Sequence, residues 1–139
     1  MEKLEEIYET IDKENIYLKE HELDSARGIL VNYEDVNAII IDNNKLPESK
    51  SIATVLAHEL GHYNTSGYYE RTSPFDLISK KEYKADKNAW DTFIGYDELK
   101  KAVRNGYNTI WELSEYFGFE ENFIARAVFY YQSNYGDIA

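Results

Sequence analysis

Apolar residues recur along the chain with two spacings, and these spacings separate an early mixed region from a later helical one. Residues 3–14 combine apolar side chains at helical spacing with acidic residues opposite, which predicts an amphipathic helix. Short apolar segments at 15–19, 28–33 and 37–42 predict three strands, and the turn-like residues 34–36 predict a hairpin between the last two. We therefore expect a small three-stranded sheet.

After residue 46 the apolar spacing is mainly helical. A helix is predicted from Pro47 to Tyr63, because proline suits the first turn of a helix. A second helix is predicted to begin near Phe75 or Ser79 and to end before Gly95. Further helices are predicted at 96–105, 109–117 and 122–135. The pattern predicts an α+β fold, in which the sheet packs on the 47–63 helix and the C-terminal half is mainly helical.

Composition adds limits on the class of protein. The chain has 139 residues, 43% of them hydrophobic and 29% charged, which predicts one globular domain over 1–139. Within it we expect residues 1–95 to hold the sheet and the two longest helices, and 96–139 the remaining helices. Cysteine is absent, so a metal must be held by nitrogen and oxygen ligands. With no signal-peptide pattern and no apolar run of membrane-spanning length, we expect a cytoplasmic protein and no membrane partner.

The predicted 47–63 helix contains the HExxH pattern His58-Glu59-Leu60-Gly61-His62. Histidines four residues apart lie on one helical face and can bind one metal ion. Two neutral imidazoles suit zinc, which keeps one position open for water and lowers the pKa of that water. Glu59 is placed beside them to take the proton and pass it to a leaving amine. The alternative is an exposed helix with two solvated histidines.

A two-histidine site needs a third protein ligand, and the next predicted helix offers Glu82 and Asp86, four residues apart. One carboxylate can bind the metal while the other accepts the N–H of a ligand histidine; we expect Glu82 to be the ligand and Asp86 its support. The alternative is that both pair with neighbouring lysines on a solvated surface. His21 is a further candidate ligand, but a lone histidine in an acidic loop is more commonly solvated.

The last two predicted helices, joined by a short turn that contains Gly118, have the shape of a helix-turn-helix. However, Arg126 is the only basic residue in 106–139, and the net charge of the chain is −11. A DNA-binding surface needs lysine and arginine to neutralise phosphates. We therefore expect no direct binding of nucleic acid.

These motifs together resemble the ImmA/IrrE metallo-endopeptidases, most closely the short ImmA-like proteins of prophages and integrative elements. The likeness runs from about residue 15 to residue 136, and includes the segments 56–63, 81–90, 111–117 and 130–136. The resemblance implies a zincin-like fold and a zinc ion bound by His58, His62 and Glu82. It also implies Glu59 as general base and acid, and Asp86 as the support of a ligand histidine, as in gluzincins.

Members of the family cleave helix-turn-helix repressors. By resemblance we expect a zinc-dependent endopeptidase whose protein substrate is a helix-turn-helix repressor of a prophage or mobile element, so that the enzyme is an anti-repressor. The alternative is a regulator that binds a repressor without cutting it and uses the metal structurally; an intact Glu59 favours the enzyme. Candidate oxyanion stabilisers, chosen because they follow the motif closely, are Tyr63, Tyr68, Tyr69 and Arg71.

Overall fold

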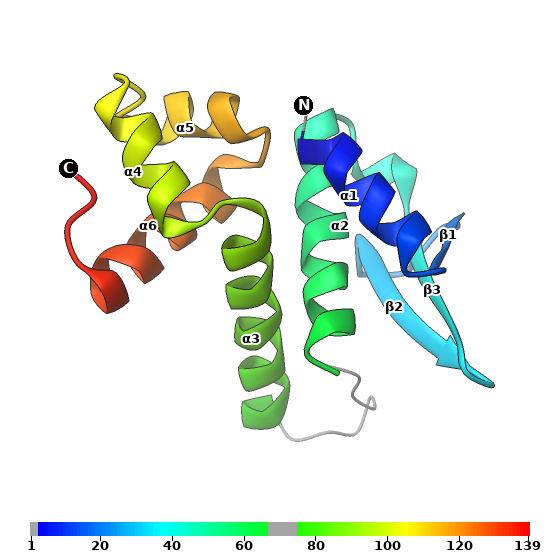
Figure 1. Cartoon of the computed structure of the whole chain (residues 1–139). Coiled ribbons are helices and arrows are strands. Elements are labelled where there is room, and N and C mark those ends of the chain that lie inside the picture. Colours follow the sequence, from blue (N-terminus) through cyan, green and yellow to red (C-terminus); the bar gives the residue numbers. More distant parts are fainter. Residues whose placement is uncertain (1–2, 67–74) are drawn as a thin grey trace.

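A computed structural model of the chain describes residues 3–66 and 75–139. Along these ranges the elements are α1 (Lys3–Lys13), β1 (Tyr17–Glu20), β2 (Gly28–Tyr33), β3 (Val36–Ile41), the 3₁₀ turn η1 (Asn43–Lys45), α2 (Ser49–Asn64), α3 (Phe75–Phe93), α4 (Tyr96–Arg104), α5 (Ile110–Phe117) and α6 (Glu121–Tyr135). The α+β class predicted from the sequence is confirmed (Figure 1). Of these helices, none is both long and apolar enough to cross a membrane.

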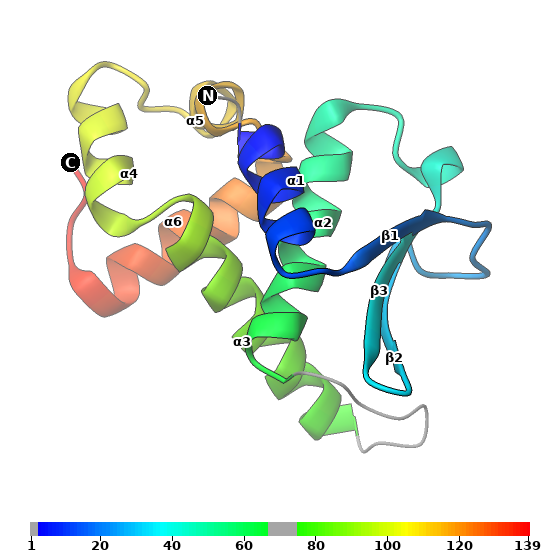
Figure 2. The ribbon, with the colours of Figure 1, turned by 45° about the vertical axis from the view of Figure 1, so that its right-hand side comes forward.

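The three strands form a sheet in the order β1-β3-β2, in which β3 is central. It pairs parallel with β1 and antiparallel with β2. The β2–β3 hairpin was predicted, but its turn is shorter than expected, because Val36 already pairs with Tyr33. Glu34 and Asp35 both have positive φ, 50° and 65°, as a two-residue type I′ turn requires. The arrangement leaves β2 at one edge of the described sheet (Figure 2).

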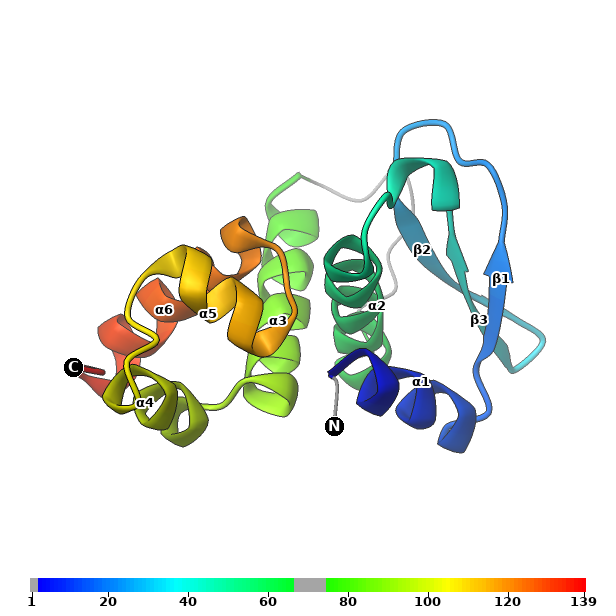
Figure 3. The same ribbon diagram turned by 90° about the horizontal axis from the view of Figure 1, so that it is seen from above.

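Helix α2 lies between the sheet and α3, as the view from above shows (Figure 3). The sheet and α1 pack on one side of it and α3 on the other. Leu56, Ala57 and Leu60 of α2 are fully buried, so the helix that carries HExxH is part of the hydrophobic core. It begins at Ser49 rather than at Pro47 as predicted, because Glu48 is the extended N-cap residue and the proline precedes it.

Helix α2 approaches α3 very closely at Gly61. A Cβ atom added there would lie 2.1 Å from the carbonyl oxygen of Ala85, far inside any van der Waals contact. The two helices therefore touch through their backbones, and only glycine fits at position 61.

This contact sets the position of the predicted site. The motif histidines stand three residues before and one residue after Gly61, and Glu82 and Asp86 stand at the same offsets from Ala85. Where the helices meet at these two small residues, His58 contacts both carboxylates and His62 contacts Glu82. The close packing of Gly61 thus places four polar side chains together.

Helices α4, α5 and α6 lie on the side of α3 away from the sheet (Figure 3). Trp90 of α3 is buried and packs against the rings of Phe123 and Tyr130 from α6, with centroid distances of 6.0 and 5.3 Å. Helix α5 ends at Phe117, and the next residue, Gly118, has a left-handed φ of 78° that makes the turn into α6. Aromatic packing on Trp90 therefore holds α6 beside the carboxylate-bearing helix.

Candidate metal centre

Glu82 lies between the two histidines of the motif. Its carboxylate oxygens are 2.6 Å from Nε2 of His58 and 3.0 Å from Nε2 of His62. One ligand atom from each of these three residues lies within 4.8 Å of the other two. Two imidazole nitrogens and a carboxylate oxygen that converge in this way match the donor set of a zinc site with three protein ligands. The residues present therefore fit a bound zinc ion.

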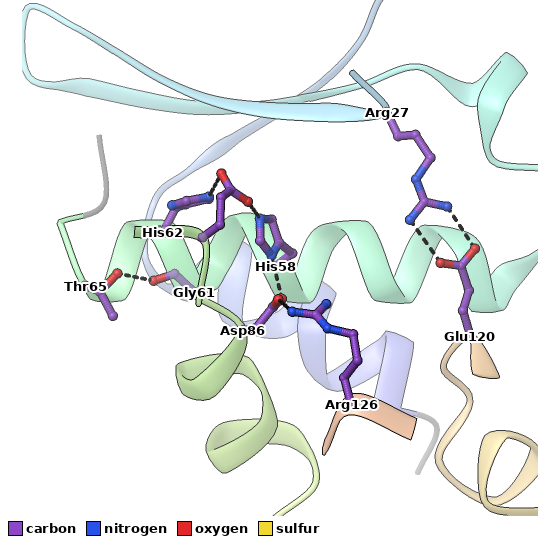
Figure 4. A network of polar contacts seen from close by, with 9 residues as sticks. Arg27, His58, Gly61, His62, Thr65, Asp86, Glu120 and Arg126 are labelled. Carbon is purple, nitrogen blue, oxygen red and sulfur yellow. Dashed lines mark hydrogen bonds and ion pairs between the residues drawn. The ribbon is translucent and has the colours of Figure 1, made fainter. Parts of the chain in front are cut away.

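The imidazole of His58 is held by carboxylates on both of its nitrogens. Nδ1 donates to Oδ1 of Asp86 at 2.7 Å (Figure 4), while Nε2 faces Glu82. Burial lowers the pKa of His58, but hydrogen bonds to Asp86 and Glu82 outweigh it and raise the pKa to about 10. In the metal-free protein His58 is therefore protonated at neutral pH, and a metal ion has to displace the proton on Nε2.

Glu59 is buried, with 7% of its surface exposed, and it lines the same cavity as the two histidines. Burial raises the pKa of its carboxyl group above the ordinary glutamate value. A carboxylate whose pKa is raised towards neutrality is better suited to accept and return a proton. The position of Glu59 thus agrees with the general base expected from the motif.

Asp86 is 4% exposed, and both of its oxygens have partners. Oδ1 accepts from His58, and Oδ2 accepts from an N–H of Arg126 on α6 at 2.5 Å (Figure 4). The sequence predicted the first contact but not the second, because Arg126 is 40 residues from Asp86 and no spacing rule connects the two positions. The available signal was its status as the only basic residue in 106–139.

A cavity of about 800 Å³ opens over these residues. Its lining includes the metal-site residues, part of the edge strand β2 and the start of α6. Near Thr54, one helical turn before His58, Arg27 and Glu120 form a two-point ion pair with N···O distances of 2.8 and 3.0 Å (Figure 4). The cavity therefore extends from the metal ligands to a salt bridge between the sheet side and the C-terminal helices.

The other residues predicted from the sequence lie elsewhere. His21 is exposed, and its Nδ1 lies 2.7 Å from the carbonyl oxygen of Glu22; it is outside the group of converging ligands. The hydroxyl of Tyr63 donates to Glu14 of the α1–β1 turn at 3.2 Å, because position 63 faces α1 rather than the cavity. The remaining oxyanion candidates, Tyr68, Tyr69 and Arg71, lie outside the described residues.

The sequence left open that the two histidines, or the two carboxylates, lie on a solvated helix surface. The burial of these side chains does not agree with that alternative. His62 is 5% exposed and Asp86 4%, so neither belongs to an open helix surface. The side chain of Glu82 is 37% exposed and faces the histidines. Burial of one histidine and one carboxylate on facing helices distinguishes this cluster from a row of surface charges.

Comparison with known families agrees with this geometry. The model of the peptidase M78 family, described as the IrrE N-terminal-like domain, matches residues 11–129. No curated protein and no solved structure gave a significant match. The matched range spans most of the chain and includes the HExxH helix, the carboxylate helix and Arg126. With its zincin-like α+β fold, the chain belongs to the peptidase M78 family of metallopeptidases.

Proposed function

We propose that this protein is a cytoplasmic zinc-dependent endopeptidase. Its metal ligands are His58, His62 and Glu82, and Glu59 is its general base and acid. The observation that supports this most directly is the convergence of three ligand atoms within 4.8 Å beside a buried glutamate, on a cavity large enough for several peptide residues.

In the proposed reaction, the metal site, Glu59 and Asp86 have different roles. Zinc in such a site supplies Lewis-acid activation of water and of the scissile carbonyl. Glu59 takes the proton of the attacking water and delivers it to the nitrogen of the leaving amine. Asp86 accepts the Nδ1 proton of His58, which keeps Nε2 of that ring directed at the ligand point.

The edge strand β2 offers a binding mode for the peptide. It lines the cavity beside the ligands, and it lies at the edge of the described sheet. An extended peptide can add to such an edge through main-chain hydrogen bonds. A packed helix cannot bind in this way, so the cleaved segment is an extended linker or terminal segment of its protein.

We propose as substrate a helix-turn-helix repressor of a prophage or mobile element, which makes the enzyme an anti-repressor. Membership of the peptidase M78 family and the resemblance to ImmA-like proteins support this choice. Direct binding to DNA is not part of the proposal. The one cation of 106–139, Arg126, pairs with Asp86, and the net charge of −11 opposes contact with phosphates.

The test is incubation of the purified repressor with the wild-type protein, with Glu59→Gln and with chelator-treated protein, followed by mass spectrometry. Two defined repressor fragments are expected from the metal-loaded wild type alone. The alternative, a binding-only regulator with a structural metal, predicts an intact repressor that loses DNA binding equally with wild type and Glu59→Gln. That result would overturn the proposed hydrolysis.

A further inference from the structure

Arg126 connects α6 to the candidate metal centre. One guanidinium nitrogen lies 2.5 Å from Oδ2 of Asp86, and the guanidinium carbon lies 5.3 Å from the ring centroid of Trp90 (Figure 4 shows the aspartate contact). Asp86 and Trp90 are four residues apart on α3, so they lie on one face of that helix. The arginine therefore spans two successive turns of the carboxylate helix.

The two contacts together fix the orientation of the guanidinium. The cation–π contact holds the group over the ring of Trp90, and the charge-assisted hydrogen bond to Asp86 fixes its direction. Trp90 is itself held in the core, 1% exposed, against Phe123 and Tyr130 of the same helix as Arg126. The docking of α6 on α3 thus determines the position of the charge that faces Asp86.

Asp86 requires such a partner. A carboxylate that is 4% exposed loses most of its hydration, and burying it with one oxygen unpaired is costly. With Arg126 on Oδ2, the other oxygen stays directed at Nδ1 of His58. Without the arginine, the carboxylate can rotate towards water in the cavity and leave the histidine without its acceptor.

We propose that Arg126 is a positioning residue of the metal centre: it fixes the carboxylate of Asp86, and through Asp86 it fixes the imidazole of His58 for metal binding. This inference rests on the proposed metal site but not on peptide hydrolysis. It gives the C-terminal helices a specific role, because the position of α6 then contributes to metal affinity on α2 and α3.

A second arginine that lines the cavity, Arg27, serves as a matched control. Arg27 also pairs with a carboxylate across the cavity wall, but its partner Glu120 is the residue before α6 and has no described contact with a metal-site side chain. Loss of Arg27 removes a similar ion pair from the same cavity without touching Asp86. A change seen with Arg126 and not with Arg27 is therefore specific to the Asp86 contact.

The experiment measures the zinc affinity of metal-free protein by competition with a chelating dye. Variants are Arg126→Ala, Arg126→Lys, Asp86→Ala, the double variant Arg126→Ala/Asp86→Ala, and Arg27→Ala. We expect Arg126→Ala to weaken zinc binding by roughly 10-fold, at the low end of the effect of partners that orient ligands. Lysine should restore part of the affinity, because it keeps the charge but not the planar guanidinium group. Arg27→Ala should bind zinc as the wild type does.

The double variant separates positioning from a general loss of structure. If Arg126 acts through Asp86, its removal has no further effect once Asp86 is alanine. Unchanged zinc affinity in Arg126→Ala, or an equal loss with and without Asp86, overturns the proposal. If wild-type protein binds no zinc, the proposed metal site fails. The Arg126–Asp86 coupling is then measured by thermal unfolding of the same metal-free variants, where additive shifts in melting temperature would overturn it.

Discussion

Two arginine–carboxylate bridges line one cavity, and they differ in what surrounds the carboxylate. Asp86, the partner of Arg126, is buried and also accepts from His58. In the other bridge the side chain of Glu120 is 28% exposed, against 6% for Asp86, whereas Arg27 and Arg126 are similarly exposed at 42% and 46%. The Arg27 contact lowers the pKa of Glu120, and the Glu120 contact raises the pKa of Arg27, so the bridge is an ordinary partly solvated ion pair.

This contrast indicates that two pairs of the same type can differ in their effect on stability and on the metal site. An exposed ion pair contributes little, because water solvates both charges well when they separate. A buried carboxylate that orients a ligand histidine transmits any displacement to the metal site. The end of the cavity that holds His58 and Asp86, called the site end below, should therefore be sensitive to small changes in side-chain position. The Arg27 end, which holds Arg27 and Glu120, should tolerate such changes.

The largest difference between the two ends of the cavity should appear in the rate of hydrolysis, when glutamate is replaced by glutamine at each end. Glu59→Gln keeps the size of the side chain but cannot accept a proton, so hydrolysis should fall by about 10²–10⁴-fold or more while zinc stays bound. Glu120→Gln is the control in the same cavity, and it should retain hydrolysis. Rates are measured on the repressor, and zinc content by elemental analysis. Equal activity of Glu59→Gln and wild type would remove Glu59 from the reaction.

Gly61→Ala tests the packing that holds the site end together. The new methyl group overlaps the backbone of Ala85, so α2 and α3 must separate, at a cost of about 1–3 kcal/mol or more in the free energy of unfolding. Urea unfolding and zinc affinity should both decline. Gly28→Ala is the control, because its Cβ would meet a side-chain methyl of Val55 at 2.5 Å, which can move more easily than backbone. A Gly61→Ala protein as stable as wild type would show that the helices are not in backbone contact.

The parts of this site that could be predicted from the sequence are those set by helical periodicity. The i, i+4 spacing of His58 and His62, and that of Glu82 and Asp86, places each pair on one face wherever the helices lie. The helical spacing and the short apolar segments likewise gave each α-helix and strand to within a few residues, because these are local signals.

The remaining features depend on contacts between distant parts of the chain. Arg126 is 40 residues from Asp86, and Arg27 is 93 residues from Glu120. No spacing rule connects such positions, since their approach depends on how α6 packs against α3 and the sheet. The β2–β3 hairpin was predictable from its local turn, but the pairing of β1 with β3 was not, because the strand segments are short and similarly apolar.

The pH dependence of zinc binding gives a smaller, graded test of the site end. Between its ordinary pKa of 6.5 and the folded value of about 10, His58 is protonated in the folded metal-free protein, so zinc must displace one proton. Zinc affinity should therefore rise by up to about tenfold per pH unit over this window. By the same linkage, the stability that His58 gives the metal-free protein is complete below pH 6.5 and is lost as pH rises through 10. Calorimetry in buffers with different ionisation enthalpies measures the released proton. Zinc binding without proton release near pH 7.5 would contradict the raised pKa of His58.

The smallest effect is expected from Arg27→Ala. Its ion pair is partly solvated, so the free energy of unfolding should fall by about 1 kcal/mol or less. The start of α6 has an independent attachment, because the backbone N–H of Glu120 donates to Oγ1 of Thr54 at 3.0 Å. Removing the arginine therefore leaves α6 in place, and zinc affinity should not change. Thermal unfolding of Arg27→Ala and of Thr54→Val, which removes that hydrogen bond, distinguishes the two attachments. A loss of several kcal/mol in Arg27→Ala alone would show that the bridge, rather than the backbone contact, holds the C-terminal helices to the cavity.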